Sequence, residues 1–249
     1  MLGLGIGLGL MLSGCQDAAS PTKGVLPFTG PMVLAISWQP AFCERAQRRR
    51  ECRTQTADRY DANHFSLHGL WPQPASNTYC GVSADQERLD RDGKWRRLDM
   101  ERLPQALWDR LRSTMPGTRS NLHRHEWVKH GTCYSKTAET YYAHSLGLMD
   151  ALNASSVRAL FGKNIGRSLR NSEIRAAFDK AFGAGVGDRV RVSCRRDGRR
   201  ELIVELTLGL AGAISAPNMS AADLGALALA APTTRPGCPV GIVDPAGFQ

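Results

Sequence analysis

Apolar residues recur along the chain in two periods, which predicts a mixture of strands and helices. Residues 32–38 form a short, mostly apolar run that is typical of a buried strand. Residues 64–72 alternate between apolar and polar positions, as a half-buried strand does. Residues 189–194 and 201–208 bracket the dipeptide Asp197-Gly198, a frequent turn signal, and this arrangement predicts a β-hairpin.

Other segments carry apolar residues at helical spacing or consist mainly of helix-forming residues. They are residues 98–115 (one helix, or two separated near Pro104), 138–152, 173–182 and the alanine-rich 221–231. Residues 74–97 are mostly polar and predict a long loop with a turn at Asp92-Gly93. Because no repeat, transmembrane span or interdomain linker interrupts this order, we expect one α+β domain over residues 31–249. Its central antiparallel sheet is expected to be flanked by helices and cross-linked by disulfides.

The first residues of the chain predict export from the cytoplasm. Residues 1–14 are rich in glycine and leucine, carry no charge and are too short to span a bilayer as a helix. They end in Leu-Ser-Gly before Cys15, which resembles the lipobox of bacterial lipoproteins. A simple signal peptide with an incidental Cys15 is the alternative. Residues 15–30 then form a tether, and we expect a periplasmic protein that lipid attachment at Cys15 could anchor to the outer membrane.

Composition and charge narrow the class of partner. The chain has 249 residues, of which 42% are hydrophobic and 22% charged, as in ordinary globular proteins. Its formal net charge of +9 favours a polyanionic partner, either nucleic acid or an anionic membrane surface. Arg45, three arginines at residues 48–50, and Arg53 crowd the segment around Cys43 and Cys52. This segment is either a solvated basic loop or a rim that steers phosphates.

Six cysteines remain when Cys15 is set aside. An even number in an exported chain indicates disulfides, although cysteine order alone does not select one pairing. We expect the pairs Cys43–Cys52, Cys80–Cys133 and Cys194–Cys238. The second pair matters most, because it would tie residue 80 to the stretch with the densest chemistry.

That stretch is HEWVKHGTC, residues 125–133, in which five ionisable side chains lie within nine residues. In an α-helix each residue turns by about 100°, so one arc of about 140° would present two imidazoles, a carboxylate and an ammonium to the same cleft. These four groups belong to His125, Glu126, Lys129 and His130. Trp127 and Val128 would face the core, and Gly131 would end the helix.

A zinc protease has a similar motif, but the spacing here differs. In His-Glu-x-x-His the two histidines are four residues apart and share one helix face. Here they are five apart, about 140° around the helix, and the sequence offers no distinctive third ligand. We therefore expect no metal and no cofactor. A solvated helix face would explain Lys129 and Glu126, but it does not easily explain two of the chain's six histidines.

A second candidate site lies in the predicted strand at residues 64–72. Alternation points Phe65 and Leu67 to one face and Ser66 and His68 to the other. Gly69 and then Trp71 follow, which is typical of a strand that runs into the edge of a site. A single histidine in a strand is more often structural. His68 is therefore a candidate catalytic residue only in combination with residues 125–133.

The two stretches together, HGLWP at residues 68–72 and HEWVKHGTC at residues 125–133, resemble the two active-site boxes of the ribonuclease T2 family. The layout is most similar to the bacterial ribonuclease I branch, and the resemblance covers most of residues 31–240. It implies an endoribonuclease that cleaves single-stranded RNA with little base preference and without a metal. The reaction would proceed through a 2′,3′-cyclic phosphate.

The resemblance also implies a role for each site residue. His130 would be the general base and His68 the general acid, while Lys129 and His125 would donate to the phosphorane and Glu126 would hold or polarise the cluster. Trp71 would pack against a base, with core packing as its alternative. Leu122, His123 and Gln73 depart from the residues common in the family, which leaves base preference open.

Two other classes of function stay open at this point. One is a catalytically silent, lipid-anchored RNA-binding protein of the same fold. The other is a metal-dependent phosphoesterase. Intact His68, Lys129 and His130 argue against the first, because binding alone needs only charge and aromatic surface. We expect RNA as the partner of a monomer that needs no protein partner.

Overall fold

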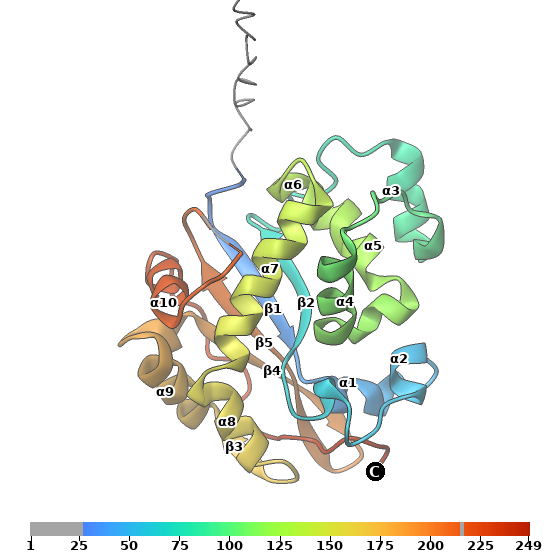
Figure 1. Ribbon diagram of the computed structural model, residues 1–249. Coiled ribbons are helices and arrows are strands. Elements are labelled where there is room, and N and C mark those ends of the chain that lie inside the picture. The colour runs from blue at the N-terminus through green and yellow to red at the C-terminus, as the bar shows by residue number, and fades with distance from the viewer. Residues whose placement is uncertain (1–26, 215–216) are drawn as a thin grey trace, which may run out of the picture.

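The computed structural model describes residues 27–214 and 217–249 (Figure 1). The expected export signal at residues 1–14, Cys15 and most of the expected tether lie outside these residues. In the described part of the chain, no helix combines the length and apolar character needed to cross a membrane.

A twisted sheet of six strands forms the centre of the molecule. The strands are β1 Met32–Ser37, β2 Ser66–Pro72, β3 Ser168–Arg170, β4 Val190–Asp197, β5 Arg200–Leu210 and β6 Val240–Ile242. Their order is β2-β1-β5-β6-β3, and β4 pairs with β5. All pairings are antiparallel except the short contact between β5 and β6. The expected central antiparallel sheet is therefore confirmed, with one parallel contact added near its edge.

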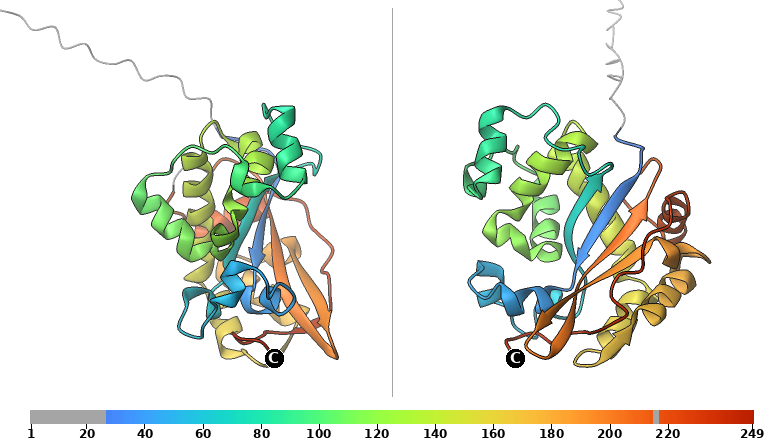
Figure 2. Two further views of the ribbon diagram at one scale, coloured as in Figure 1. Left: turned by 90° about the vertical axis from the view of Figure 1, so that its right-hand side faces the viewer. Right: turned by 180° about the vertical axis from the view of Figure 1, so that it is seen from behind.

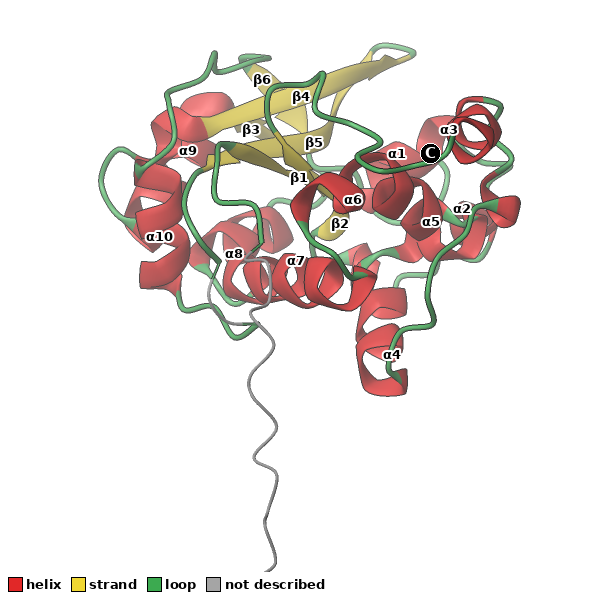
Figure 3. Ribbon diagram, turned by 90° about the horizontal axis from the view of Figure 1, so that it is seen from above, coloured by secondary structure: helices red, strands yellow, loops and turns green. Residues whose placement is uncertain are grey.

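Helices cover one face of this sheet, and loops cross the other (Figures 2 and 3). The α-helices are α1 Gln39–Arg45, α2 Arg50–Arg53, α3 Ala84–Arg91, α4 Gln105–Thr114, α5 Leu122–Glu126, α6 Thr132–Tyr134, α7 Ala138–Asn153, α8 Ser156–Lys163, α9 Asn171–Phe182 and α10 Ala221–Leu229. Short 3₁₀ turns are η1 Tyr60–Ala62, η2 Trp95–Arg97, η3 Pro116–Ser120 and η5 Val186–Arg189, and η4 Trp127–Gly131 is a π-helix. The C-terminal segment after α10 runs across the back of the sheet (Figure 2).

The long helix α7 fixes the position of β2, which carries His68. Thr137 caps the start of this helix by accepting a hydrogen bond from the Thr140 amide. The buried hydroxyl of Tyr141 donates to the Leu70 carbonyl and accepts from the Leu70 amide, both at 3.1 Å. Tyr141 therefore clamps β2 from within the core, on the strand residue that follows Gly69.

Most of the elements expected from periodicity are present. The first strand, the hairpin and the helices at residues 138–152, 173–182 and 221–231 are confirmed within a few residues at each end. Of the two options for residues 98–115, the structure has one helix, α4, which begins directly after Pro104. The expectation of an unbroken loop over residues 74–97 is wrong. Ser83 caps a helix there, α3, whose charged surface gives little apolar periodicity because it buries only Leu89 and Asp90.

All three expected disulfides are present. Cys43–Cys52 joins α1 to α2, Cys80–Cys133 joins the loop after β2 to α6, and Cys194–Cys238 joins β4 to the segment before β6. The second cross-link closes a separation of 53 residues, so it restricts the unfolded chain over a loop that ends in the second histidine-containing stretch.

Candidate active site

His68 lies at a β-bulge in the middle of β2. The register between β1 and β2 pairs Ala35 with Gly69 and Ile36 with Leu67, so His68 is the extra residue. The strict alternation expected for residues 64–72 is therefore wrong beyond Leu67. His68 and Trp71, three residues apart, are the half-exposed positions of the strand, which the bulge makes possible by breaking the period of two.

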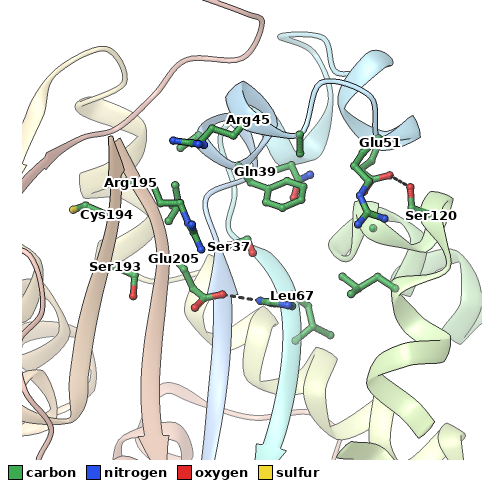
Figure 4. A pocket seen from close by; sticks show the side chains of 18 of the residues that line it. Ser37, Gln39, Arg45, Glu51, Leu67, Ser120, Ser193, Cys194, Arg195 and Glu205 are labelled. Carbon is green, nitrogen blue, oxygen red and sulfur yellow. Dashed lines mark hydrogen bonds and ion pairs between the residues drawn. The ribbon is translucent and has the colours of Figure 1, made fainter. Parts of the chain in front are cut away.

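The His68 ring reaches across β1 to a carboxylate on β5. His68 Nδ1 lies 2.6 Å from Oε2 of Glu205, and Figure 4 shows this contact spanning the strand between them. Because Nδ1 faces the carboxylate, it carries the proton and leaves Nε2 directed toward Glu126, whose Oε1 is 3.6 Å away. Glu205 thereby fixes both the orientation and the tautomer of the ring.

The second histidine-containing stretch folds as a wider turn than an ordinary helix. α5 ends at Glu126, and residues Trp127–Gly131 continue as a π-helix into α6, which ends at Tyr134. The expectation that Gly131 ends the helix is wrong, since its backbone is helical. A glycine is needed there for space, because a Cβ would lie 2.4 Å from the Trp127 ring and 3.0 Å from Tyr141.

Glu126 is the buried centre on which the site converges. Its Oε2 accepts a hydrogen bond of 2.8 Å from Trp71 Nε1, and its Oε1 lies 3.9 Å from His125 Nε2. The side chain is 1% exposed. This carboxylate sits directly over Gly69, where a Cβ would come within 2.1 Å of Oε2. Gly69 is therefore required for the close approach of the two segments.

Asp90, a residue that sequence patterns did not single out, holds the His125 ring at Nδ1. His125 Nδ1 lies 2.7 Å from Oδ1 of Asp90, a buried residue of α3. The Tyr79 hydroxyl donates to the other oxygen of Asp90 at 2.8 Å. Trp95 stacks on the His125 ring with a centroid distance of 4.6 Å. The segment of residues 74–97, which the sequence predicts to be a loop, therefore supplies the support for His125.

His130 also packs against Trp71 and completes the cluster. Its ring centroid is 5.5 Å from that of Trp71 and 6.4 Å from that of His125. The centroid of His68 lies 5.1 Å from Trp71. The two imidazoles that the sequence singles out therefore contact the same indole, and the structure brings them to one site. His130 Nδ1 is buried and has no hydrogen-bond partner among the described residues.

The surroundings push the two histidines toward opposite protonation states. Burial lowers the pKa of His130 to about 3, and the positive charge of Lys129 acts in the same direction. Burial also disfavours the charged form of His68. However, the hydrogen bond from Glu205 and the charges of Glu126 and Glu205 outweigh it and raise the pKa of His68 above its ordinary value. His130 therefore favours the neutral form, whereas His68 keeps its proton to higher pH than a free imidazole does.

Burial raises the pKa of Glu126 above its ordinary value, although His68, His125 and Lys129 favour its charged form. Lys129 is half-buried beside this carboxylate, and its backbone carbonyl accepts from the Tyr79 amide at 2.9 Å. Among residues 27–214 and 217–249, no group of three or more His, Cys, Asp or Glu side chains is arranged to hold a metal ion.

A pocket of about 530 Å³ opens beside His68 (Figure 4). The residues that line it include Leu67, Glu205, Gln39 and Leu122. Leu122, one of the departures from the family pattern, therefore lies in the pocket. The other two lie outside it: His123 is buried against Trp108, and Gln73 donates to the Trp71 carbonyl at 3.2 Å.

The expected site residues are accounted for as follows. His68, Trp71, His125, Glu126, Lys129 and His130 lie together, and Cys15 lies outside the described residues. Sequence patterns missed Glu205, Asp90 and Trp95. Trp71 is half-exposed, packs near two imidazoles and is hydrogen-bonded to Glu126, so it is not a simple core residue.

Comparison with known proteins agrees with this geometry. The model of the ribonuclease T2 family matches residues 29–218. Ribonuclease I of Escherichia coli (strain K12) is 31% identical over 210 residues, which cover 74% of this chain and 76% of that protein. Ribonuclease T2 of Homo sapiens is 25% identical over 136 residues, 53% of this chain and 46% of the human protein.

A solved structure supports the same fold. The crystal structure of RNase NT in complex with 5′-AMP superposes with a TM-score of 0.54 at 18% identity, covering 88% of this chain and 99% of that one. The extent of the family match and the identity to the Escherichia coli enzyme are sufficient for assignment. The chain belongs to the ribonuclease T2 family, on its bacterial ribonuclease I branch, and is an endoribonuclease.

Proposed function

We propose that this endoribonuclease cleaves single-stranded RNA without a metal ion, by attack of the 2′-oxygen on its own phosphorus. The observation that carries the proposal is the packing of two imidazoles against Trp71, one with a lowered pKa, His130, and one with a raised pKa, His68. Such a pair can remove one proton and supply another in a single displacement.

His130 is the general base in this proposal. Its low pKa keeps it unprotonated, and the negative charge of a bound phosphodiester would raise that pKa toward the range where it accepts a proton efficiently. His68 is the general acid that protonates the departing 5′-oxygen. The 2′-oxygen becomes bonded to phosphorus, and the bond from phosphorus to the 5′-oxygen breaks, which leaves a 2′,3′-cyclic phosphate.

The remaining groups stabilise the charge that builds on phosphorus. Lys129 and His125 supply positive charge and donors to the phosphorane oxygens. Glu126 accepts from Trp71 and lies between His68 and His125, so it sets the positions of all three. A base that stacks on the flat face of the Trp71 indole in an open pocket needs few specific hydrogen bonds, which favours weak base preference.

The test is incubation of purified protein with RNA and with DNA of the same sequence in EDTA, followed by end-group analysis of the products. The proposal predicts RNA fragments that end in 2′,3′-cyclic phosphate and intact DNA, because DNA lacks the nucleophile. Magnesium-dependent cleavage or 5′-phosphate ends would point to a metal-dependent phosphoesterase instead. RNA binding without turnover would point to a silent binding protein.

Replacing Glu205 with glutamine is expected to move the alkaline limb of the pH profile of kcat/KM to lower pH. The carboxylate raises the pKa of His68, so its removal lets the acid lose its proton earlier as pH rises. Glu205 is absent from the groups that act on the pKa of His130, so the acid limb should move much less. Coincident profiles for Glu205→Gln and the parent enzyme would show that Glu205 does not tune His68.

We further propose export to an oxidising compartment, which the three disulfides support. Lipid attachment at Cys15 is part of this proposal. Mass spectrometry of the cell-purified protein tests it, because a diacylated Cys15 would be the first residue of the mature chain. A mature chain that begins elsewhere and carries no lipid would contradict it.

A further inference from the structure

Exposed arginines gather beside the candidate active site. We name them the arginine track: Arg45, Arg48, Arg49, Arg50, Arg53, Arg119 and Arg195. Within residues 27–214 and 217–249, none of these side chains forms an ion pair with a carboxylate. The two acidic residues of the same segment do not neutralise them. Glu44 is buried against Arg200, and Glu51 is buried and accepts from the Ser120 hydroxyl.

The inner part of the track lines the pocket that begins at His68. Arg45, Arg49 and Arg195 surround this pocket together with Phe42. In Figure 4, Arg45 of α1 and Arg195 of β4 lie on one side, and Glu51 with Ser120 lies on the other. The Arg45 guanidinium donates to the Arg196 carbonyl at 2.8 Å, which holds it at the junction of α1 and β4.

The outer part of the track lies outside the pocket that His68 lines. Arg50, Arg53 and Arg119 line a second hollow of about 470 Å³ together with Thr54. The short elements α2 and η3 contribute to both hollows, Glu51 and Ser120 to the inner one and the three arginines to the outer one. The two hollows therefore share these two elements as a wall, and we call the two hollows together the basic path.

Contacts tie this path to the catalytic cluster. The Arg49 guanidinium lies 5.4 Å from the centroid of the Trp95 ring, and Trp95 in turn stacks on His125. Phe42 lines the inner pocket and is 39% exposed, although exposure of an apolar side chain to water is unfavourable. An exposed aromatic face among unpaired guanidinium groups is the combination that binds single-stranded nucleic acid, since bases stack and phosphates pair.

The proposed chemistry gives the path a direction. His68 protonates the 5′-oxygen of the leaving nucleotide, so the hollow that starts at His68 receives the part of the strand on the 3′ side of the cleaved bond. An anionic membrane would need a broad basic surface, whereas six of these seven arginines, all but Arg48, line two hollows, which suits a strand.

We propose that the arginine track binds the phosphates of the RNA segment 3′ to the cleaved bond, beyond the first leaving nucleotide, and that Phe42 stacks on one of its bases. The direction rests on the proposed function, because it follows from the role of His68. The track would make the enzyme favour long strands and would make its action on them sensitive to salt.

The test compares a dinucleotide whose first residue alone is a ribonucleotide with the same dinucleotide extended by six 2′-deoxynucleotides on the 3′ side or on the 5′ side, so that each substrate has one cleavable bond. The variant carries Arg50→Gln, Arg53→Gln and Arg119→Gln. It should cleave the dinucleotide within about twofold of the parent enzyme, but the 3′-extended substrate about tenfold more slowly in kcat/KM. Its dependence on salt for that substrate should also be shallower. The 5′-extended substrate should be affected much less.

A matched control removes the same charge elsewhere. Arg167→Gln, Arg191→Gln and Arg235→Gln change three exposed arginines that line neither hollow, and this variant should behave like the parent on all three substrates. Equal losses for both triple variants would reduce the effect to net charge and overturn the proposal. A loss confined to the 5′-extended substrate would overturn its direction.

Binding separates the track from catalysis. A fluorescent single-stranded DNA of eight nucleotides cannot be cleaved by this chemistry, and the Arg50/Arg53/Arg119 variant should bind it about tenfold more weakly in anisotropy. This result is expected even if the proposed catalytic mechanism is wrong. Failure of the arginine-track proposal can therefore be distinguished from failure of the proposed mechanism. Unchanged DNA and RNA binding, with lost binding to phosphatidylglycerol vesicles, would assign the arginines to a membrane surface and overturn the proposal.

Discussion

Replacing His130 with alanine is expected to lower kcat/KM for RNA by about 10²–10⁴-fold, the usual contribution of one acid–base group. The neutral imidazole beside Trp71 is the group placed to take the 2′-hydroxyl proton, and its low pKa keeps it unprotonated over the working range. The measurement is initial-rate kinetics on a labelled single-stranded RNA, with the unfolding midpoint recorded for each protein.

The loss should be one of activity and not of folding. His130 is only partly buried, and its Nδ1 has no hydrogen-bond partner among the described residues, so truncation breaks few contacts. His64→Ala is the matched control, since His64 lies outside the site and stacks on Tyr60. That variant should retain parental activity. A His130→Ala enzyme within about tenfold of the parent would exclude His130 as the base.

Adding a single methyl group at Gly69 is expected to cost about 10²-fold in activity, the penalty that displacement of a catalytic group by about 1 Å can bring. The new Cβ would lie 2.1 Å from Glu126 Oε2 and 2.5 Å from Trp71 Nε1. Both atoms belong to one buried hydrogen bond, so neither can move without displacing the carboxylate that also faces His68. Steady-state kinetics of Gly69→Ala tests this expectation.

Gly162→Ala is the control for this substitution. Gly162 lies within α8, and the nearest atom to an added Cβ is Arg158 Nη1 at 3.9 Å. Because alanine favours a helix by about 1 kcal/mol over glycine, this variant should be at least as stable as the parent and fully active. Parental activity in Gly69→Ala would mean that the position of Glu126 is not critical.

The sequence was sufficient to locate the residues near the reaction but not the groups that tune them. Two short stretches rich in ionisable and aromatic residues contain His68, Glu126, Lys129 and His130. These residues can therefore be found from the sequence alone. Glu205 is 137 residues away from His68 along the chain, and only strand order brings the two together. Sequence patterns carry no signal for such a contact.

Backbone irregularities account for the other differences. An ideal helix predicts that Gly131 is a stop, but a π-helix carries the chain through it and lets its missing side chain accommodate Trp127. An ideal strand predicts strict alternation, but the bulge at His68 brings Trp71 to the same half-exposed surface. Both irregularities occur at the site itself, where bulges and π-turns are common because they redirect functional side chains.

The most direct measurement of the central claim compares two leaving groups in two variants. A ribonucleoside 3′-phosphate ester of nitrophenol needs no proton on its leaving group, whereas a dinucleotide does. If His68 is the acid and His130 the base, His68→Ala should lose about 10²–10⁴-fold on the dinucleotide and less than about tenfold on the ester, while His130→Ala should lose heavily on both. Equal losses on both substrates for His68→Ala, or recovery of His130→Ala on the ester, would contradict the assignment.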